Sequence, residues 1–170
     1  MENIAPILKP ADSRQRLRQN QHIAIISHPL FLTRDGRRDL ILRPDGAPKN
    51  DVVPLYDHHE LESAPIGIVN LEYLSLGKVN GLNLCFVTGM IYCSSLPLKP
   101  KQAVSIGAPL VNSVGINDIL GDILEVSLVD KPMLGGCMCL PAEEAMQFIP
   151  TLSLRAPSLL KELQRELASQ

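Results

Sequence analysis

The feature that most constrains the fold is a succession of short apolar runs, rich in β-branched residues and separated by turn residues. The clearest run is LNLCFVTGMIYC at 82–93, and the preceding run, PIGIVNLEYLSLG at 65–77, ends where Gly77 and Gly81 mark a turn. Apolar, roughly alternating runs on both sides of a glycine-rich turn are typical of a β-hairpin. We therefore predict that these two runs form paired strands.

Further runs of this kind lie on both sides of the predicted hairpin. They occupy residues 22–32, 40–44, 52–59, 103–111 and 123–132. Asp35-Gly36 and the stretch PDGAPKND supply turn signals between them. Many short strands joined by turns predict a β-barrel or a β-sandwich.

Helical patterns are confined to the last thirty residues. Pro141 followed by two glutamates is typical of a helix start, and Ser158 is a candidate N-cap for a second helix. That second helix places four leucines on one face, namely Leu159, Leu160, Leu163 and Leu167. Such a face packs on its own domain or binds a partner or a second copy of the chain. The predicted organisation is a polar arm at 1–20, a β-domain at 21–150 and an amphipathic helix at 151–170, giving a mostly β protein of the α+β class.

Composition limits the functional classes. The 170 residues suit one domain, and the net charge of −2 argues against an extensive nucleic-acid-binding surface, although Arg14, Arg16 and Arg18 form a basic arm. No run of 18 apolar residues and no signal-peptide pattern occurs, which predicts a cytoplasmic protein without a membrane span. The four cysteines lack zinc-ligand spacing and are expected to be free thiols.

Two adjacent histidines, His58 and His59, lie in the polar stretch LYDHHELESAPIG. In an extended chain their rings would point to opposite faces, so one ring could face a pocket while the other faces solvent. They cannot easily ligate one metal together and no further ligands are spaced nearby, so we predict neither a metal site nor a cofactor. The alternative interpretation is a polar turn between strands.

Ser105 lies in AVSIGA, where small neighbours would let a substrate carbonyl approach and Gly107 would let backbone N–H groups form an oxyanion hole. The alternative is a serine at the core edge, bonded to a backbone carbonyl. Glu125 begins an apolar run and either orients a histidine or faces solvent. Ser127 would share the face of Glu125 and is a weaker nucleophile candidate.

The order of these motifs, from the acid-histidine stretch and Pro-Ile-Gly through VSIGA to LEVSLVDKP, resembles the phage prohead maturation proteases. These are relatives of the herpesvirus assembly proteases, and the likeness covers roughly residues 50–133. It implies a small closed or partly open β-barrel of the herpesvirus-protease type. It also implies His59 as the base, because Glu60 follows it, with His58 as the alternate. Ser105 matches the nucleophile, and Glu125 matches the third member, where herpesvirus enzymes use a second histidine.

The resemblance implies a serine endopeptidase that processes scaffold and major capsid protein precursors inside the immature capsid, in the host cytoplasm. It further implies self-association through a helix, and a neutral histidine base predicts activity rising through about pH 6 to 7. The alternative is a catalytically inactive barrel that acts as a structural or scaffolding component of the capsid. Two departures favour that alternative: two prolines replace the family's helix before Ser105, and Gly67 lies further from His59 than the family pattern predicts.

Overall fold

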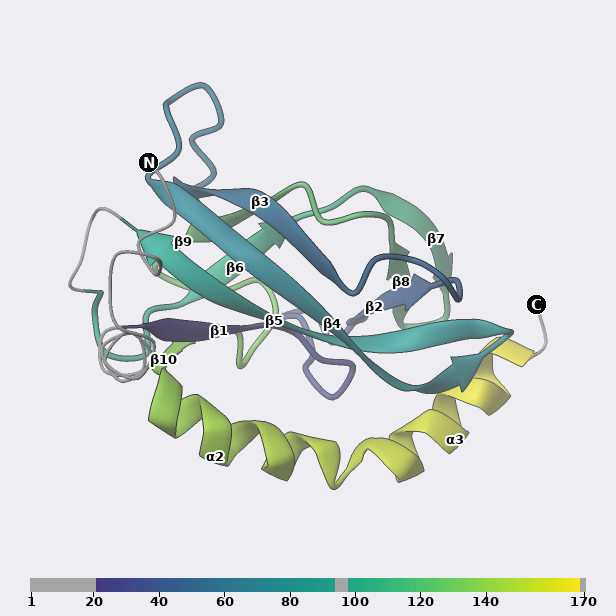
Figure 1. Cartoon of the computed structure of the whole chain (residues 1–170). Coiled ribbons are helices and arrows are strands. Elements are labelled where there is room, and N and C mark those ends of the chain that lie inside the picture. Colours follow the sequence, from purple (N-terminus) through teal and green to yellow (C-terminus); the bar gives the residue numbers. More distant parts are fainter. Residues whose placement is uncertain (1–20, 94–97, 169–170) are drawn as a thin grey trace.

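The computed structural model describes residues 21–93 and 98–168, so the predicted arm with Arg14, Arg16 and Arg18 lies outside the described residues. The described chain is mostly β, with a curled half-barrel sheet followed by two C-terminal helices (Figure 1). The strands are β1 (His22–Ser27), β2 (Arg38–Arg43), β3 (Asn50–Asp57), β4 (Gly67–Val79), β5 (Leu82–Cys93), β6 (Val104–Gly107), β7 (Leu110–Val114), β8 (Asn117–Leu120), β9 (Glu125–Leu128) and β10 (Cys139–Pro141). The helices are α2 (Ala142–Ser153) and α3 (Ala156–Ala168).

The predicted hairpin is confirmed as the longest pair of strands. β4 and β5 pair antiparallel from Gly67 opposite Cys93 to Val79 opposite Leu82. The two residues between them, Asn80 and Gly81, have φ angles of 51° and 79°. Two consecutive left-handed residues are what a tight hairpin turn requires, and asparagine followed by glycine is the most favourable pair for them.

The strand order of the sheet brings distant segments of the chain together. The path runs β6-β9-β3-β4-β5-β2-β8-β7, and β1 adds to it by pairing with β5 and β10. Strand β9 lies parallel to β3, with Leu55 opposite Val126 and Asp57 opposite Leu128. On its other side β9 pairs antiparallel with β6. The end of β3, the whole of β9 and the whole of β6 therefore lie side by side.

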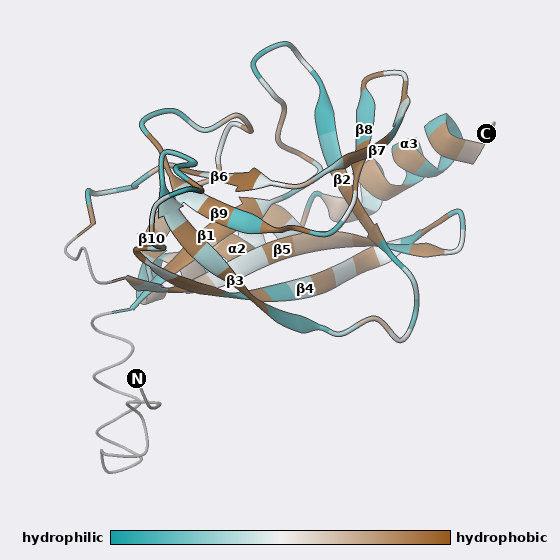
Figure 2. Ribbon diagram, turned by 90° about the horizontal axis from the view of Figure 1, so that it is seen from above, coloured by the Kyte–Doolittle hydropathy of each residue, from teal (hydrophilic) through white to brown (hydrophobic). Residues whose placement is uncertain are grey.

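Hydrogen bonds around residues 137–139 link the β6 edge of the sheet to the start of β10, which pairs with β1. The Cys139 N–H donates to the Gln102 carbonyl at 2.8 Å, and the Val104 N–H donates to the Cys137 carbonyl at 3.2 Å. The interior is filled by fully buried aliphatic side chains, including those of Leu55, Val69, Leu71, Val104 and Val126. In Figure 2 the strand ribbons combine brown, hydrophobic segments with teal ones, and several of the connecting loops are teal.

The terminal helix packs on its own sheet rather than standing apart. Leu159, Leu163 and Leu167 are buried in a cluster with Leu40, Val79 and Leu84, and Leu160 packs against that cluster. Gly77 admits Leu160, because a Cβ at Gly77 would lie 2.3 Å from Leu160 Cδ2, and its φ of +141° also favours glycine. Neither helix of the described chain is long and apolar enough to cross a membrane.

Several local predictions are corrected by the structure. The residue boundary predicted at 150/151 falls inside α2, and the leucines of α3 share a buried cluster with the strands. Ser158 is the third residue of α3 rather than its N-cap, and Pro141 occupies the N-cap position of α2. The run at 103–111 is divided between β6 and β7, and β8 and β10 had not been predicted.

Candidate active site

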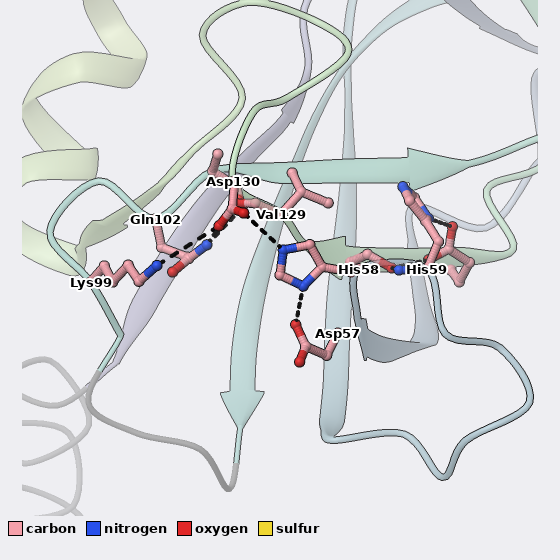
Figure 3. Close-up of polar contacts among 10 residues, drawn as sticks. Asp57, His58, His59, Lys99, Gln102, Val129 and Asp130 are labelled. Carbon is pink, nitrogen blue, oxygen red and sulfur yellow. Dashed lines mark hydrogen bonds and ion pairs between the residues drawn. The ribbon is translucent and has the colours of Figure 1, made fainter.

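The two histidines lie in a turn directly after β3, not in an extended segment as predicted. His58 and His59 have φ angles of 48° and 58°, which places both in the left-handed region. Histidine is among the few non-glycine residues that adopt this conformation with some frequency. The two rings nevertheless point to different partners, as Figure 3 shows. The His58 ring contacts Asp57 and Asp130.

The His59 ring contacts Glu125 at the start of β9. Nδ1 of His59 lies 2.8 Å from Oε2 of Glu125. The Glu125 side chain is only 6% exposed, whereas that of His59 is 41% exposed. A carboxylate bonded to Nδ1 favours the tautomer that carries its proton there, and this leaves Nε2 as the basic nitrogen. The arrangement thus combines a buried, fixed carboxylate with an imidazole whose other face is open to solvent.

Ser127 holds both members of this pair. Its hydroxyl donates to Oε1 of Glu125 at 2.6 Å and accepts the backbone N–H of His59 at 3.0 Å. Ser127 is completely buried and faces Tyr56 across the parallel β3–β9 pair. Sequence reasoning placed Ser127 on the face of Glu125 but considered it only as a weak nucleophile candidate. The parallel pairing that brings it to His59 leaves no local signal in the sequence.

Ser105 lies on the neighbouring strand, directly opposite Ser127 in the antiparallel β6–β9 pair. Directly opposed residues in such a pair have Cβ atoms about 4.5–5.5 Å apart and share one face of the sheet. Ser105 therefore lies on the face that carries Ser127 and Glu125, while Val104 and Ile106 pack into the core. No described residue forms a hydrogen bond with the Ser105 hydroxyl, so in this conformation it is near the histidine–glutamate pair without being bonded to it.

Gly107 makes room for the Glu125 carboxylate. The two residues are opposite each other in the β6–β9 pair, and a Cβ at Gly107 would lie 2.2 Å from Oε2 of Glu125. Gly107 belongs to the regular strand β6 and not to a turn. Because it has no side chain, Gly107 leaves space for the Glu125 side chain that contacts His59. This role was not predicted from the sequence. The predicted part of Gly107 in an oxyanion hole stays a prediction.

His58, the alternate base, is directed away from Glu125. Its Nδ1 lies 2.5 Å from Oδ1 of Asp57, and its Nε2 lies 3.5 Å from Oδ2 of Asp130. The hydrogen bond that His58 donates to Asp57 is the largest cause of its raised pKa; desolvation opposes it, and the charges of Asp57 and Asp130 add smaller contributions that raise the pKa. Lys99 also approaches Asp130, at 3.8 Å.

The surroundings of β6 contain little free volume. A cavity of about 110 Å³ adjoins Ser105 and is lined by Asp39, Met133, Cys137 and neighbouring aliphatic residues. Sites for small-molecule ligands usually occupy about 300–1,000 Å³, so this cavity is too small for an organic cofactor. Within residues 21–93 and 98–168, no three side chains of His, Cys, Asp or Glu converge as metal ligands would.

The buried thiols do not add a second nucleophile. Burial raises the pKa of Cys139 to about 12 and that of Cys137 further still. Reactive cysteines require a lowered pKa, because the thiolate is the nucleophile. Among the described residues, the arrangement best suited to covalent chemistry is therefore the set of His59, Glu125, Ser127 and Ser105.

Comparisons with protein-family models, with curated proteins and with solved structures gave no match to this chain, so the chemistry has to be inferred from the site itself.

Proposed function

We propose that this chain is a serine endopeptidase in which Ser105 is the nucleophile, His59 the general base and Glu125 the residue that orients the base. The observation that carries the proposal is the 2.8 Å contact between His59 and the buried Glu125, on the sheet face where Ser105 lies opposite Ser127. A hydroxyl becomes nucleophilic when an oriented imidazole takes its proton. An orienting carboxylate that is itself anchored, here by Ser127, fixes both the tautomer and the ring position.

The proposed reaction uses these groups in two stages. The Ser105 oxygen forms a bond to the scissile carbonyl carbon, and its proton passes to Nε2 of His59. The C–N bond then breaks, and the leaving amine takes that proton, which leaves an acyl ester on Ser105. Water activated by the same nitrogen hydrolyses the ester, while backbone N–H groups near Gly107 would stabilise the oxyanion. Glu125, through its contact with Nδ1, stabilises the imidazolium.

The substrate class and setting rest on the resemblance to prohead proteases. They would be scaffold and major capsid protein precursors, processed inside an immature capsid in the host cytoplasm. Self-association through a helix would require a surface other than the leucine face of α3, which is buried against the sheet. The exposed side chains of Met146 in α2 and Leu154 after it are available for such a contact.

A second candidate function is a catalytically inactive barrel that serves as a structural component of the capsid. It is favoured by one observation, the lack of a hydrogen bond between the Ser105 hydroxyl and His59 in the described chain. Catalytic hydrogen bonds are often long in unliganded enzymes and tighten when substrate binds, so this geometry is compatible with both functions.

Labelling with a fluorophosphonate probe tests the proposal, with mass spectrometry of the labelled peptide to locate the adduct. The endopeptidase predicts an adduct on Ser105 that disappears in Ser105→Ala. The variant Ser113→Ala, in the β7–β8 hairpin, is a matched control that should keep wild-type labelling. An adduct on Ser127 instead would show that Ser127, and not Ser105, is the nucleophile. A folded wild-type protein that remains unlabelled would support the structural barrel.

A further inference from the structure

A second polar network lies beside the candidate active site and involves neither Ser105 nor Glu125. His58 lies between two carboxylates, Asp57 at the end of β3 and Asp130 after β9, and Lys99 approaches Asp130 from the segment before β6 (Figure 3). The His58 backbone N–H also donates to the Leu128 carbonyl at 2.9 Å. The network therefore contacts three segments that are far apart in the sequence.

These three segments are the ones that carry the site. The turn after β3 holds His59, β9 holds Glu125 and Ser127, and β6 holds Ser105. Gln102 adds a direct connection between the last two, because its side-chain amide donates to the Val129 carbonyl at 2.9 Å. Asp57, His58 and Asp130 are all substantially exposed, so each ion pair is weak by itself. These ion pairs matter because of where they lie: His58 is the residue directly before His59, so a contact that holds His58 also restricts the position of His59.

We propose that His58 is a positioning residue, which bridges Asp57 and Asp130 and thereby holds the turn so that the His59 ring stays on Glu125. This inference rests on the proposed function and extends it to the residue that the sequence presented as the alternate base. His58 acts through His59 and does not touch the substrate. This role gives each of the two adjacent histidines a separate partner. His58 binds the exposed carboxylates of Asp57 and Asp130, and His59 binds the buried carboxylate of Glu125.

The charge balance makes the bridge dependent on pH. The groups that face it are the carboxylates of Asp57 and Asp130 and the ammonium group of Lys99. Protonated His58 interacts favourably with both carboxylates, and these partners raise its pKa. The bridge is therefore complete below the raised pKa of His58 and weakens as pH rises through it. Loss of the charge should loosen the turn and move His59 away from Glu125.

Three variants separate these effects. His58→Asn tolerates the left-handed backbone but cannot carry the charge. Asp130→Asn removes one side of the bridge without changing the turn itself. Asp122→Asn, at an exposed carboxylate before β9, is the matched control. Two quantities are measured against pH: the rate of fluorophosphonate labelling, and the hydrogen-exchange protection of the His59 amide, corrected for the intrinsic pH dependence of exchange.

In the wild type, protection of the His59 amide should fall as pH rises through the raised pKa of His58. Asp130→Asn should shift that fall to lower pH, and His58→Asn should give low protection at every pH. At neutral pH both should label about two- to fivefold more slowly, as loss of a weak exposed ion pair predicts. Asp122→Asn should match the wild type.

The inference is overturned if His58→Asn keeps the wild-type fall in protection, or if Asp130→Asn leaves both quantities unchanged. The two measurements also distinguish this inference from the proposed function. If the wild type is not labelled but the protection of the His59 amide changes as expected, the endopeptidase proposal is wrong and the positioning role of His58 is supported. If Ser105 is labelled at the same rate in the wild type and in both variants, the endopeptidase proposal is supported and the positioning role of His58 is wrong.

Discussion

Nδ1 of His59 lies 2.8 Å from Oε2 of Glu125, although the two residues are 66 positions apart in the chain. The contact exists because β9 lies parallel to β3 and because the backbone turns sharply after Asp57. The geometry of the pair therefore depends on the pairing of β3 with β9 and on the turn that follows β3.

Replacing Glu125 by glutamine should separate orientation from charge. Glutamine keeps the size of the side chain but cannot stabilise an imidazolium, so the fluorophosphonate labelling rate should fall by about 10²- to 10⁴-fold, the usual range for a general-base system. The control is Glu60→Gln, which alters the exposed acid next to His59 in sequence. A rate that is unchanged in Glu125→Gln would remove Glu125 from the proposed mechanism.

Gly107→Ala should disrupt the site through a steric clash, without changing any charge or hydrogen-bonding group. The new methyl group would lie 2.2 Å from Oε2 of Glu125, so the carboxylate must move away from its position beside His59. Overpacking of this kind typically costs about 1–3 kcal/mol of the free energy of unfolding, and labelling should fall together with stability. Gly135→Ala is the control, because its methyl group would meet only the Leu32 carbonyl at an ordinary 3.5 Å. Urea unfolding and the labelling rate measure the two effects, and wild-type values for both in Gly107→Ala would contradict the packing described.

His28 should make the fold sensitive to mild acid. The side chain is fully buried between Phe31 and Phe86, and burial lowers the pKa of His28 from 6.5 to about 4. Between these values the unfolded chain binds a proton that the folded chain does not, so stability falls as pH decreases and levels off below about pH 4. A shift of this size corresponds to a loss of about 3 kcal/mol in the free energy of unfolding.

The measurement is urea unfolding of the wild type and of His28→Asn at intervals from about pH 4 to about pH 7. Asparagine can still accept the Leu30 N–H that His28 Nδ1 accepts, but it does not titrate. The difference in stability between the two proteins should therefore narrow as pH falls. A constant difference across this range would show that His28 does not titrate in this way.

Leu163→Ala should show that α3 belongs to the core of the sheet domain. Leu163 is completely buried, so its truncation should lower the free energy of unfolding by about 2–5 kcal/mol. Leu154→Ala, at a position 82% exposed, should change stability by less than about 0.5 kcal/mol. Equal stabilities of the two variants would mean that α3 is not required by the sheet.

Local sequence patterns were sufficient for the long central strands and for the terminal helix. The alternation in β4 and the apolar residues of β5 indicated the hairpin, and the leucines of α3 indicated the face that packs on the sheet. Strand β7 was not predicted as a separate strand, because its residues are mostly exposed and its side chains do not alternate between polar and apolar. Its pairing with β8 depends on a partner further along the chain, and each strand is too short to carry a pattern.

The site was accessible to sequence reasoning only in part. Small residues around Ser105 and an acid at the start of an apolar strand are visible in the sequence, and they led to Ser105 and Glu125. The left-handed backbone at His58 and His59 is not visible, because the same residues fit an extended strand equally well. The dual role of Ser127 requires knowledge that β9 is parallel to β3, which is information about topology and not about any local pattern.

The parallel arrangement of β3 and β9 has a consequence for biosynthesis. Strand β3 leaves the ribosome long before β9, and non-local pairings of this kind form late because a long loop must first be closed. In a nascent chain, His59 consequently cannot pair with Glu125 until most of the polypeptide has emerged. Whatever reactivity the finished molecule has, its unfinished precursors on the ribosome do not share it.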